Sequence, residues 1–470
     1  MPIATINPAT GQLVESFDAL PDGQVDAAIE RSVEAFEALC GTTFAERAQW
    51  LTAAADLLDA DRDDIGRLMT TEMGKTYASA KAEAAKCAAA CRFYAANAER
   101  FLADEPADAS AVGATRAYVR YQPLGPVLAV MPWNFPLWQV MRFAAPALMA
   151  GNVGLLKHAS NVPQTALYLE KLFRRAGFPV GAFQTLLVGS RSVERILTDP
   201  RVRAATLTGS EGAGRAVGRT AGQELKKVVL ELGGSDPFVV MPSADLERAA
   251  EVATTARCQN NGQSCIAAKR FIVHTDVYDE FAEAFVARMS ALRVGDPMSA
   301  DTDVGPLATE QGRADVEELV RDAVDKGARV LCGGQRPDGD GWWYPPTVVT
   351  DLIPEMRMWS EEVFGPVAGL FRAASYTDAI RLANGTSFGL GSNAWTRDPA
   401  EQERFATDLD AGSVFINGMT TSFPELPFGG VKNSGHGREL SAQGIREFCN
   451  LKTVWVGSGE SRGGAGSHSE

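Results

Sequence analysis

Apolar residues near the N-terminus recur with the spacing of α-helices. Val25 and Ile29 are followed by two more apolar residues at helical spacing, which places these side chains on one helix face. Thr43 and Glu46 have the capping-box spacing before the next apolar stretch, a pattern that marks a helix N-terminus. The Ala-rich run after Thr76 predicts a further helix. The first hundred residues are therefore expected to be helical.

From Val127 onward the pattern changes to short apolar runs that alternate with helical stretches such as Gln164–Ala176. The lengths of the runs are those of buried parallel strands. Five such strands with helical connections predict an open, doubly wound α/β sheet. The five runs are Val127–Met131, Val153–Lys157, Gln184–Val188, Ala204–Thr208 and Lys227–Glu231.

A second series of apolar runs begins after Gly233 and Gly234, again with helical patterns between them. It predicts a second α/β domain with its own sheet. Its candidate strands are Phe271–His274, Arg329–Leu331, Thr347–Thr350, Val367–Phe371 and Ser413–Asn417.

Two further segments, Tyr118–Tyr121 and Thr453–Val456, have the pattern of exposed strands with aromatic faces. Unpaired strand edges of this kind can pair with another chain. The tail Gly457–Glu470 is rich in Gly and Ser, and it is predicted to be disordered.

Composition and charge narrow the class of protein. The 470 residues are 45% hydrophobic and 22% charged, which is ordinary for globular domains. The net charge of -14 would repel phosphate backbones, so nucleic acid is not expected as a partner. No stretch reaches the roughly 20 apolar residues that cross a bilayer, and the N-terminus lacks a signal-peptide pattern. Seven Cys without paired spacing predict reduced thiols in a cytoplasmic protein.

Cys265 follows the sequence Asn-Gly-Gln-Ser, a polar, glycine-containing context expected for a loop that enters a site. Its thiol could be a nucleophile, or it could be a small buried apolar side chain, as most free Cys are. Glu231 ends an apolar strand and precedes Leu232 and two glycines. At the carboxyl end of a parallel strand it could act as a general base, or it could be a solvated acid at a strand end.

Other strand ends carry polar residues as well. Asn134 lies between two prolines after the first strand; its amide could stabilise an oxyanion or form a structural turn. Gly209 and Ser210 follow the fourth strand and open a helix, which could hold a phosphate. Lys157 ends the second strand.

The four His include no metal-binding spacing, so a catalytic metal is not expected.

Taken together and in order, these motifs resemble the aldehyde dehydrogenase superfamily over nearly the whole chain. Within it, the run Met131–Arg142 resembles bacterial succinate-semialdehyde dehydrogenases. The motifs that carry the resemblance are Pro132–Pro136, Lys157–Ser160, Leu207–Ser210, Glu231–Gly234, Gly262–Cys265, Glu361–Pro366 and Pro427–Lys432.

The resemblance implies an enzyme that oxidises an aldehyde through a thiohemiacetal and then a thioester on Cys265. The side chain of Asn134 and the backbone N–H of Cys265 would hold the oxyanion. Glu231 would activate the water that hydrolyses the thioester, and Glu439 matches a position that relays protons. The cofactor would be NADP or NAD.

Eight positions match cofactor contacts of the family: Trp133, Lys157, Ser160, Gly209, Ser210, Leu232, Glu362 and Phe364. Ser160 bears on the choice of cofactor, because NAD-restricted relatives often carry Glu there. A carboxylate would repel the 2′-phosphate of NADP, whereas Ser would not. The expectation is that NADP is accepted; His158, where Pro is commoner, departs from the family pattern.

The substrate expected from the resemblance is succinate semialdehyde or a related short acid semialdehyde. Arg142 matches an arginine that binds the substrate carboxylate, and such a pair discriminates strongly against uncharged aldehydes; alternatively, Arg142 pairs with a structural acid. Gln259 stands where related enzymes carry a second Arg, and Ser422 matches a third carboxylate contact. Broad specificity for uncharged aldehydes, acyl transfer to coenzyme A, and a non-catalytic binding protein are the alternative functions.

The resemblance also predicts domains and assembly. Residues 1–104 and 124–232 would bind the cofactor, and 233–435 would form the catalytic domain. Segments 105–123 and 436–457 would bridge subunits of a homodimer or homotetramer, and 458–470 would be the disordered tail.

Overall fold

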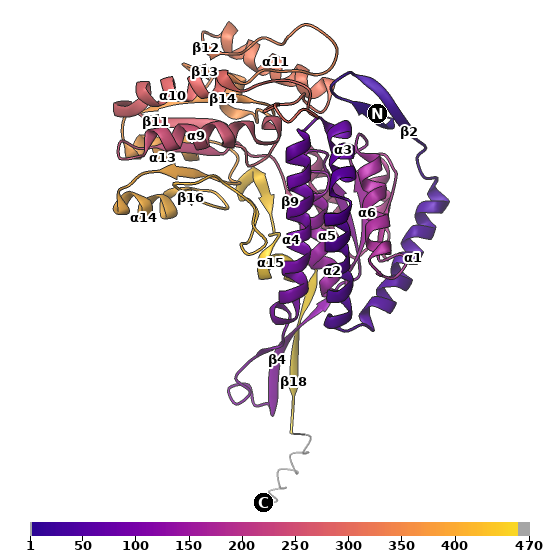
Figure 1. Cartoon of the computed structure of the whole chain (residues 1–470). Helices are drawn as coiled ribbons and strands as arrows, with labels where there is room; N and C mark the ends of the chain where they lie inside the picture. Colours follow the sequence, from indigo (N-terminus) through magenta and orange to yellow (C-terminus); the bar gives the residue numbers. More distant parts are fainter. Residues whose placement is uncertain (1, 459–470) are drawn as a thin grey trace, which may run out of the picture.

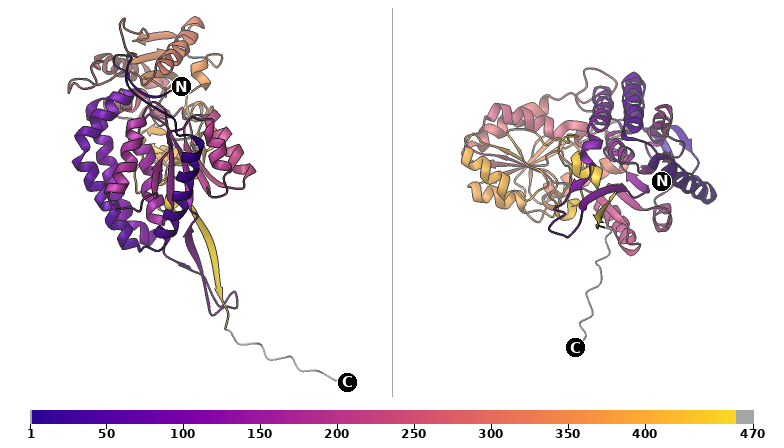
Figure 2. Two further views of the ribbon diagram at one scale, coloured as in Figure 1. Left: turned by 90° about the vertical axis from the view of Figure 1, so that its right-hand side faces the viewer. Right: turned by 90° about the horizontal axis from the view of Figure 1, so that it is seen from below.

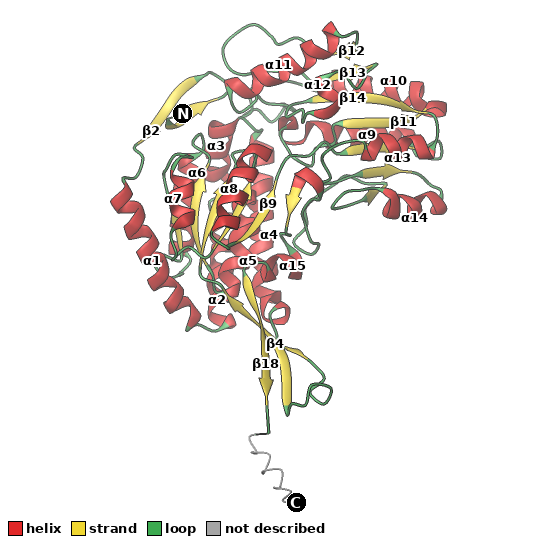
Figure 3. Cartoon of the chain, turned by 180° about the vertical axis from the view of Figure 1, so that it is seen from behind, coloured by secondary structure: helices red, strands yellow, loops and turns green. Residues whose placement is uncertain are grey.

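The computed structural model describes residues 2–458, so nearly all of the predicted tail lies outside the described residues. Two α/β units lie side by side, and a narrow three-stranded sheet extends away from both (Figures 1, 2 and 3). The predicted α/β fold is confirmed. No helix within residues 2–458 combines the length and apolar character needed to cross a membrane.

The first unit is built on a six-stranded sheet with the order β17-β9-β8-β5-β6-β7. Its five parallel strands correspond to the five predicted runs, and β17 adds an antiparallel edge. The bounds are β5 Pro126–Met131, β6 Val153–His158, β7 Phe183–Thr185, β8 Ala204–Thr208, β9 Lys227–Glu231 and β17 Gly435–His436.

Two details of this sheet differ from the prediction. β7 ends at Thr185 because the chain turns tightly, with the Val188 N–H donating to the Leu186 carbonyl. β17 is only two residues long, too short to show a pattern. It depends on Gly435, whose φ is +118° and where a Cβ would lie 1.9 Å from the Leu230 oxygen.

Helices cover both faces of the six-stranded sheet. α5, of which every residue is buried, lies against β5 and β6 and beneath α2 and α4. The predicted capping box at Thr43 and Glu46 is confirmed at the start of α2. The helices are α1 Asp22–Cys40, α2 Phe44–Ala60, α3 Arg62–Met73, α4 Tyr77–Phe101, α5 Trp138–Ala150, α6 Pro163–Arg175, α7 Ser192–Thr198 and α8 Glu211–Gln223.

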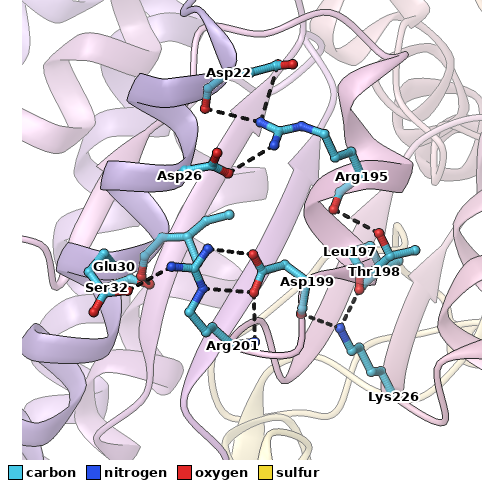
Figure 4. A network of polar contacts seen from close by, with 11 residues as sticks. Asp22, Asp26, Glu30, Ser32, Arg195, Leu197, Thr198, Asp199, Arg201 and Lys226 are labelled. Carbon is cyan, nitrogen blue, oxygen red and sulfur yellow. Dashed lines mark hydrogen bonds and ion pairs between the residues drawn. The ribbon is translucent and has the colours of Figure 1, made fainter.

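A network of ion pairs joins α1 to α7 and to the loop between α7 and β8 (Figure 4). Arg195 of α7 pairs with Asp26 at 2.9 Å, and Arg201 joins Glu30 at 2.7 Å and Asp199 at 2.6 Å. Exposed pairs of this kind contribute about 0–1 kcal/mol each. Their main effect is therefore to orient α1, whose apolar face supplies the larger stabilisation.

The N-terminal hairpin, β1 Ile3–Asn7 and β2 Gln12–Phe17, is not predicted by the sequence pattern. The residues of β2 are almost all exposed, so they lack the alternation that marks a half-buried strand. β1 is held by its contacts with α3 and α6, including the hydrogen bond from the Thr5 hydroxyl to Glu72.

The second unit contains a seven-stranded sheet with the order β12-β13-β14-β11-β10-β15-β16. The five predicted runs all contribute strands, whereas β10 and β15 were not predicted: β10 begins at a proline, and β15 is the sequence Asn-Ala-Trp, which has no β-branched residue. The bounds are β10 Pro237–Val240, β11 Arg270–His274, β12 Arg329–Cys332, β13 Thr347–Thr350, β14 Val367–Ala373, β15 Asn393–Trp395 and β16 Phe415–Ile416.

Two apolar clusters cover the faces of this sheet, one with α9 and α10 and the other with α11 to α14. The helices and turns are α9 Leu246–Cys258, η1 Gln259–Gly262, η2 Thr275–Val277, α10 Tyr278–Ala291, α11 Glu310–Asp325, α12 Arg357–Ser360, α13 Tyr376–Asn384, α14 Pro399–Asp408, η3 Lys432–Ser434 and α15 Ser441–Arg446.

The third sheet joins β3 Glu105–Pro106, β4 Arg116–Pro123 and β18 Cys449–Val456. β4 and β18 pair antiparallel over all eight residues, which confirms both predicted exposed strands and lengthens them. The outer edge of β18 has no partner strand among residues 2–458. The domain boundaries themselves stay predictions; β17, at the 435/436 boundary, pairs with the first unit.

Candidate active site

The loop that carries Cys265 has an unusual backbone. Asn260, Asn261 and Gly262 have φ values of 54°, 58° and 74° in succession, a region that Asn and Gly tolerate best. A Cβ at Gly262 would lie 2.3 Å from the Gly365 carbonyl carbon. The Asn261 amide donates to the carbonyls of Gly74 and Pro306, both at 2.9 Å. The loop is therefore held rigidly between the two α/β units.

Asn134 is brought to this loop from the turn after β5. Its Nδ2 donates to the Gln263 carbonyl at 3.1 Å, and Asn260 Nδ2 donates to the Asn134 carbonyl at 2.7 Å. Asn134 is buried, and one of its two amide hydrogens remains after the bond to Gln263. Asn134, the predicted oxyanion donor, therefore contacts a residue that precedes the predicted nucleophile Cys265 by two positions.

Cys265 is partly exposed and lines a cavity of about 170 Å³. Burial raises the pKa of its thiol to about 12, against the opposing charges of Arg142 and Lys269. The thiol is therefore protonated at neutral pH, and attack on a substrate requires a proton acceptor. The Lys269 ammonium donates to the carbonyls of Ser264 and Cys265, which fixes the loop after the nucleophile.

Glu231 lies at the end of β9 with 2% exposure. Neither carboxylate oxygen has a hydrogen-bond partner among residues 2–458. Burial raises the pKa of Glu231 well above its usual value, and the nearby Glu439 raises it further, while Arg142 and Arg438 oppose the shift. A buried carboxyl without a partner is costly, as expected for a functional group rather than a structural one.

Glu439 and Arg142 form a buried ion pair, with 2.8 Å between Arg142 Nε and Glu439 Oε2. Both oxygens of Glu439 and the Arg142 Nε nevertheless lack a hydrogen bond of good geometry, so we interpret the contact as electrostatic. The Arg142 guanidinium also lies 4.4 Å from the centre of the Phe428 ring. Burial raises the pKa of Glu439, and Arg142 opposes that effect.

The cavity beside Cys265 contains all three predicted substrate residues, namely Arg142, Gln259 and Ser422. The terminal Nη2 of Arg142 and Nε2 of Gln259 are buried donors that have no hydrogen-bond partner within residues 2–458. Glu231 and Glu439 do not line this cavity. Sequence reasoning missed Lys86, which also lines it; the only signal was a single basic residue within an apolar stretch of the Ala-rich helix.

The predicted cofactor residues lie at the carboxyl ends of β5, β6, β8 and β9 and on the facing loop of the second unit. Ser210 caps α8, and Gly209 donates to the Glu231 carbonyl at 3.0 Å. Trp133 packs edge-on against Phe364, with 5.8 Å between ring centres. Leu232 is buried.

Lys157 and Glu362 complete the candidate cofactor groove. Lys157 is buried without a hydrogen-bond or ion-pair partner in residues 2–458, and burial lowers its pKa. Glu362 accepts from the Gly234 N–H at 3.1 Å and lies 3.3 Å from Lys269 Nζ. An ammonium without a partner in the described residues suits a phosphate or ribose group of a cofactor.

Ser160 lines a small cavity with His158 and Leu186. No carboxylate lines this cavity. His158 is buried, with its Nε2 2.9 Å from the Pro136 carbonyl. This contact joins the end of β6 to the loop that carries Trp133 and Asn134.

Known proteins resemble this chain over nearly its whole length. A Mycobacterium tuberculosis protein named succinate-semialdehyde dehydrogenase (NADP+) 1 is 68% identical over 456 residues, covering 97% of this chain and 100% of the relative. A Mycobacterium avium protein named succinate-semialdehyde dehydrogenase (NADP+) is 66% identical over 471 residues and covers 100% of both chains.

A crystal structure of succinic semialdehyde dehydrogenase from Streptococcus pyogenes in complex with NADP+ superimposes with a TM-score of 0.94. It is 36% identical and covers 97% of this chain and 100% of its own. The model of the aldehyde dehydrogenase family matches residues 1–454. Because the family model spans residues 1–454 and the relatives align over nearly the whole chain, this chain belongs to the aldehyde dehydrogenase family.

Proposed function

We propose that the protein oxidises succinate semialdehyde, or a related short acid semialdehyde, to the corresponding carboxylate with NADP or NAD. The observation that carries the proposal is the cavity in which the Cys265 thiol shares its walls with unpartnered donors of Arg142 and Gln259. Donors of this kind suit a substrate that bears a carboxylate. The names of the relatives that are 66–68% identical support the same substrate.

The reaction begins when the Cys265 thiol gives its proton to solvent water and the sulfur bonds to the aldehyde carbon, giving a thiohemiacetal. The remaining amide hydrogen of Asn134 and the backbone N–H of Cys265 stabilise the negative oxygen. When bound, a nicotinamide supplies the hydride acceptor, and loss of hydride from this carbon leaves a thioester on Cys265.

Hydrolysis then releases the acid and regenerates the thiol. Glu231 takes a proton from the attacking water, which suits a carboxyl whose pKa burial has raised. Glu439 lies close enough to influence the pKa of Glu231, and we assign it the relay of that proton. Because the acyl group leaves as a free acid, this base is needed; transfer to coenzyme A would not require it.

The candidate cofactor residues fit a dinucleotide. Lys157 and the N-terminus of α8 would hold phosphate or ribose oxygens, and Glu362 and Phe364 would line the nicotinamide ribose. No carboxylate of residues 2–458 lines the small cavity that Ser160 borders, so no negative charge there opposes a 2′-phosphate, and we propose that NADP is accepted.

Steady-state kinetics with succinate semialdehyde, butanal and both cofactors tests the function. Wild type should prefer succinate semialdehyde by at least tenfold in kcat/KM, from about 1.5–3 kcal/mol per charged hydrogen bond. Cys265→Ala should be inactive, whereas Cys40→Ala, at an exposed site, should be normal. Equal use of the two aldehydes would instead indicate broad specificity, and activity in Cys265→Ala would refute the mechanism.

We also propose that the chain forms a homodimer or homotetramer through β18. Its outer edge pairs with no strand of residues 2–458, and Leu451 and Trp455 are 63% and 54% exposed, a combination that favours pairing with a second chain. Light scattering on the purified protein tests the assembly, and a monomer at micromolar concentration would contradict it.

A further inference from the structure

Lys86 extends from α4 into the cavity beside Cys265. Its ammonium donates to the Ser422 hydroxyl at 3.0 Å and lies 4.3 Å from the centre of the Trp138 ring. One of its three N–H groups is therefore used by a hydrogen bond, which leaves donors for another partner.

No carboxylate within residues 2–458 forms an ion pair with Lys86. The nearest acid along its own helix, Glu83, also lines the cavity, but it is already bound to Lys75 and to the N–H groups of Leu137 and Trp138, both at 2.8 Å. Arg142, the other cation of the cavity, faces Glu439. The ammonium of Lys86 is thus the positive charge of this cavity that lacks an acidic partner in the described chain.

Ser422 points to the same conclusion. Its oxygen accepts from Lys86 Nζ and also from Trp138 Nε1 at 2.9 Å, which uses both acceptor positions of a hydroxyl. The hydroxyl hydrogen must then donate elsewhere, and residues 2–458 offer it no acceptor. Because Ser422 is buried and lines the cavity, that hydrogen is available to a ligand there.

We propose that Lys86, together with Ser422, is a specificity-determining anchor for the carboxylate of the substrate. The ammonium supplies the charge and the hydroxyl supplies a second donor, while Arg142, whose Nη2 has no hydrogen-bond partner within residues 2–458, lines the same cavity. This inference rests on the proposed function, because it assumes a substrate with a carboxylate. It assigns Lys86 to binding and not to the chemical step.

The test compares Lys86→Met with Lys86→Arg. Met keeps most of the side-chain volume against Trp138 and removes the charge, whereas Arg keeps the charge. Lys86→Met should lower kcat/KM for succinate semialdehyde about 10- to 100-fold, mainly through KM, as expected for one lost charged hydrogen bond. Its kcat/KM for butanal should change less than about threefold, and Lys86→Arg should retain the preference.

Lys81→Met is the matched control, because Lys81 lies on the same helix, pairs with Asp63 at 3.6 Å and does not line the cavity. It should leave both substrates unchanged. Turnover of butanal by Lys86→Met verifies that the variant is folded. An equal loss for succinate semialdehyde and butanal would overturn the assignment of Lys86.

Inhibition by succinate separates this inference from the proposed function. With butanal as the substrate, succinate should compete in wild type, and its Ki should rise at least tenfold in Lys86→Met, while inhibition by the neutral analogue butanamide stays unchanged. This measurement does not depend on turnover of succinate semialdehyde. If wild type failed to prefer the semialdehyde but showed this Ki shift, the substrate proposal would fail and the anchor would stand; an unchanged Ki would refute the anchor.

Discussion

Removing the charge of Arg142 should destabilise the protein strongly, because the buried carboxyl of Glu439 would lose its cation. Arg142 and Glu439 are 2% and 5% exposed, and their nearest charged atoms are 2.8 Å apart. Glu439 has no other cation in an ion pair with it among the described residues. In the Arg142→Leu variant, the carboxyl of Glu439 would lie in a low-dielectric site beside Glu231. That carboxyl would then have to ionise at a high free-energy cost or take up a proton.

The size of the effect follows from the burial of both groups. Breaking a buried pair by removing one partner costs about 3–5 kcal/mol, whereas replacing both partners by apolar residues is often neutral or stabilising. The double variant Arg142→Leu/Glu439→Leu should therefore be more stable than Arg142→Leu by several kcal/mol. At about 2–4 °C per kcal/mol for domains of this size, the single variant should melt roughly 10 °C below wild type.

Scanning calorimetry on wild type, both single variants and the double variant, at one protein concentration, measures this coupling. Arg92→Leu is the control: Arg92 makes exposed ion pairs with Asp56 and Asp59, and its loss should cost less than about 1 kcal/mol. A single Arg142→Leu variant that melts with wild type, or a double variant that is the least stable of the four, would refute the interpretation of the pair.

Three further predictions concern the base, the cofactor and pH. Glu231→Gln should lower kcat by at least about 100-fold yet retain a stopped-flow burst of reduced cofactor; an unchanged kcat would remove Glu231 from its role. Ser160→Glu should lower kcat/KM for NADP relative to NAD about tenfold or more through charge repulsion, and an unaltered ratio would place the 2′-phosphate elsewhere. Burial lowers the pKa of His158 to about 4, so its neutral form stabilises the fold above pH 6.5, and this stabilisation, about 3 kcal/mol, is lost as the pH falls from 6.5 through 4. The melting temperature of His158→Gln should fall less than that of wild type over this range, and identical slopes would contradict the assignment.

The parts of the fold that the sequence predicts best are the long, continuously apolar strands and the helices with caps. The runs at β8 and β9 match the observed bounds residue for residue, because buried parallel strands leave a mainly apolar signature. β17 and β15 have two and three residues. Their pairing depends on close approach of distant segments, as at Gly435, which no local pattern encodes.

In the site, too, local sequence patterns predict some features, whereas contacts between distant segments are not predicted. Cys265 and Asn134 are visible in the sequence because each interrupts an apolar pattern with a polar, conformationally special turn. The partners that tune them are not visible. Lys86 meets Ser422 across 336 positions of the chain, and the contact between Arg142 and Glu439 likewise joins residues that are far apart in the sequence. Local sequence therefore indicates which groups could react, but not which charges surround them.

The charges around the cavity explain why a second cation belongs there. With Arg142 facing Glu439, a substrate carboxylate bound beside Arg142 alone would place two anions around one guanidinium in a dehydrated site. That arrangement would raise the pKa of Glu439 further and favour its protonated form, which could not accept a proton from Glu231. An ammonium at Lys86 balances the substrate carboxylate with its own charge. The carboxylate could then bind beside both cations of the cavity without favouring the protonated form of the residue that we assign to the proton relay.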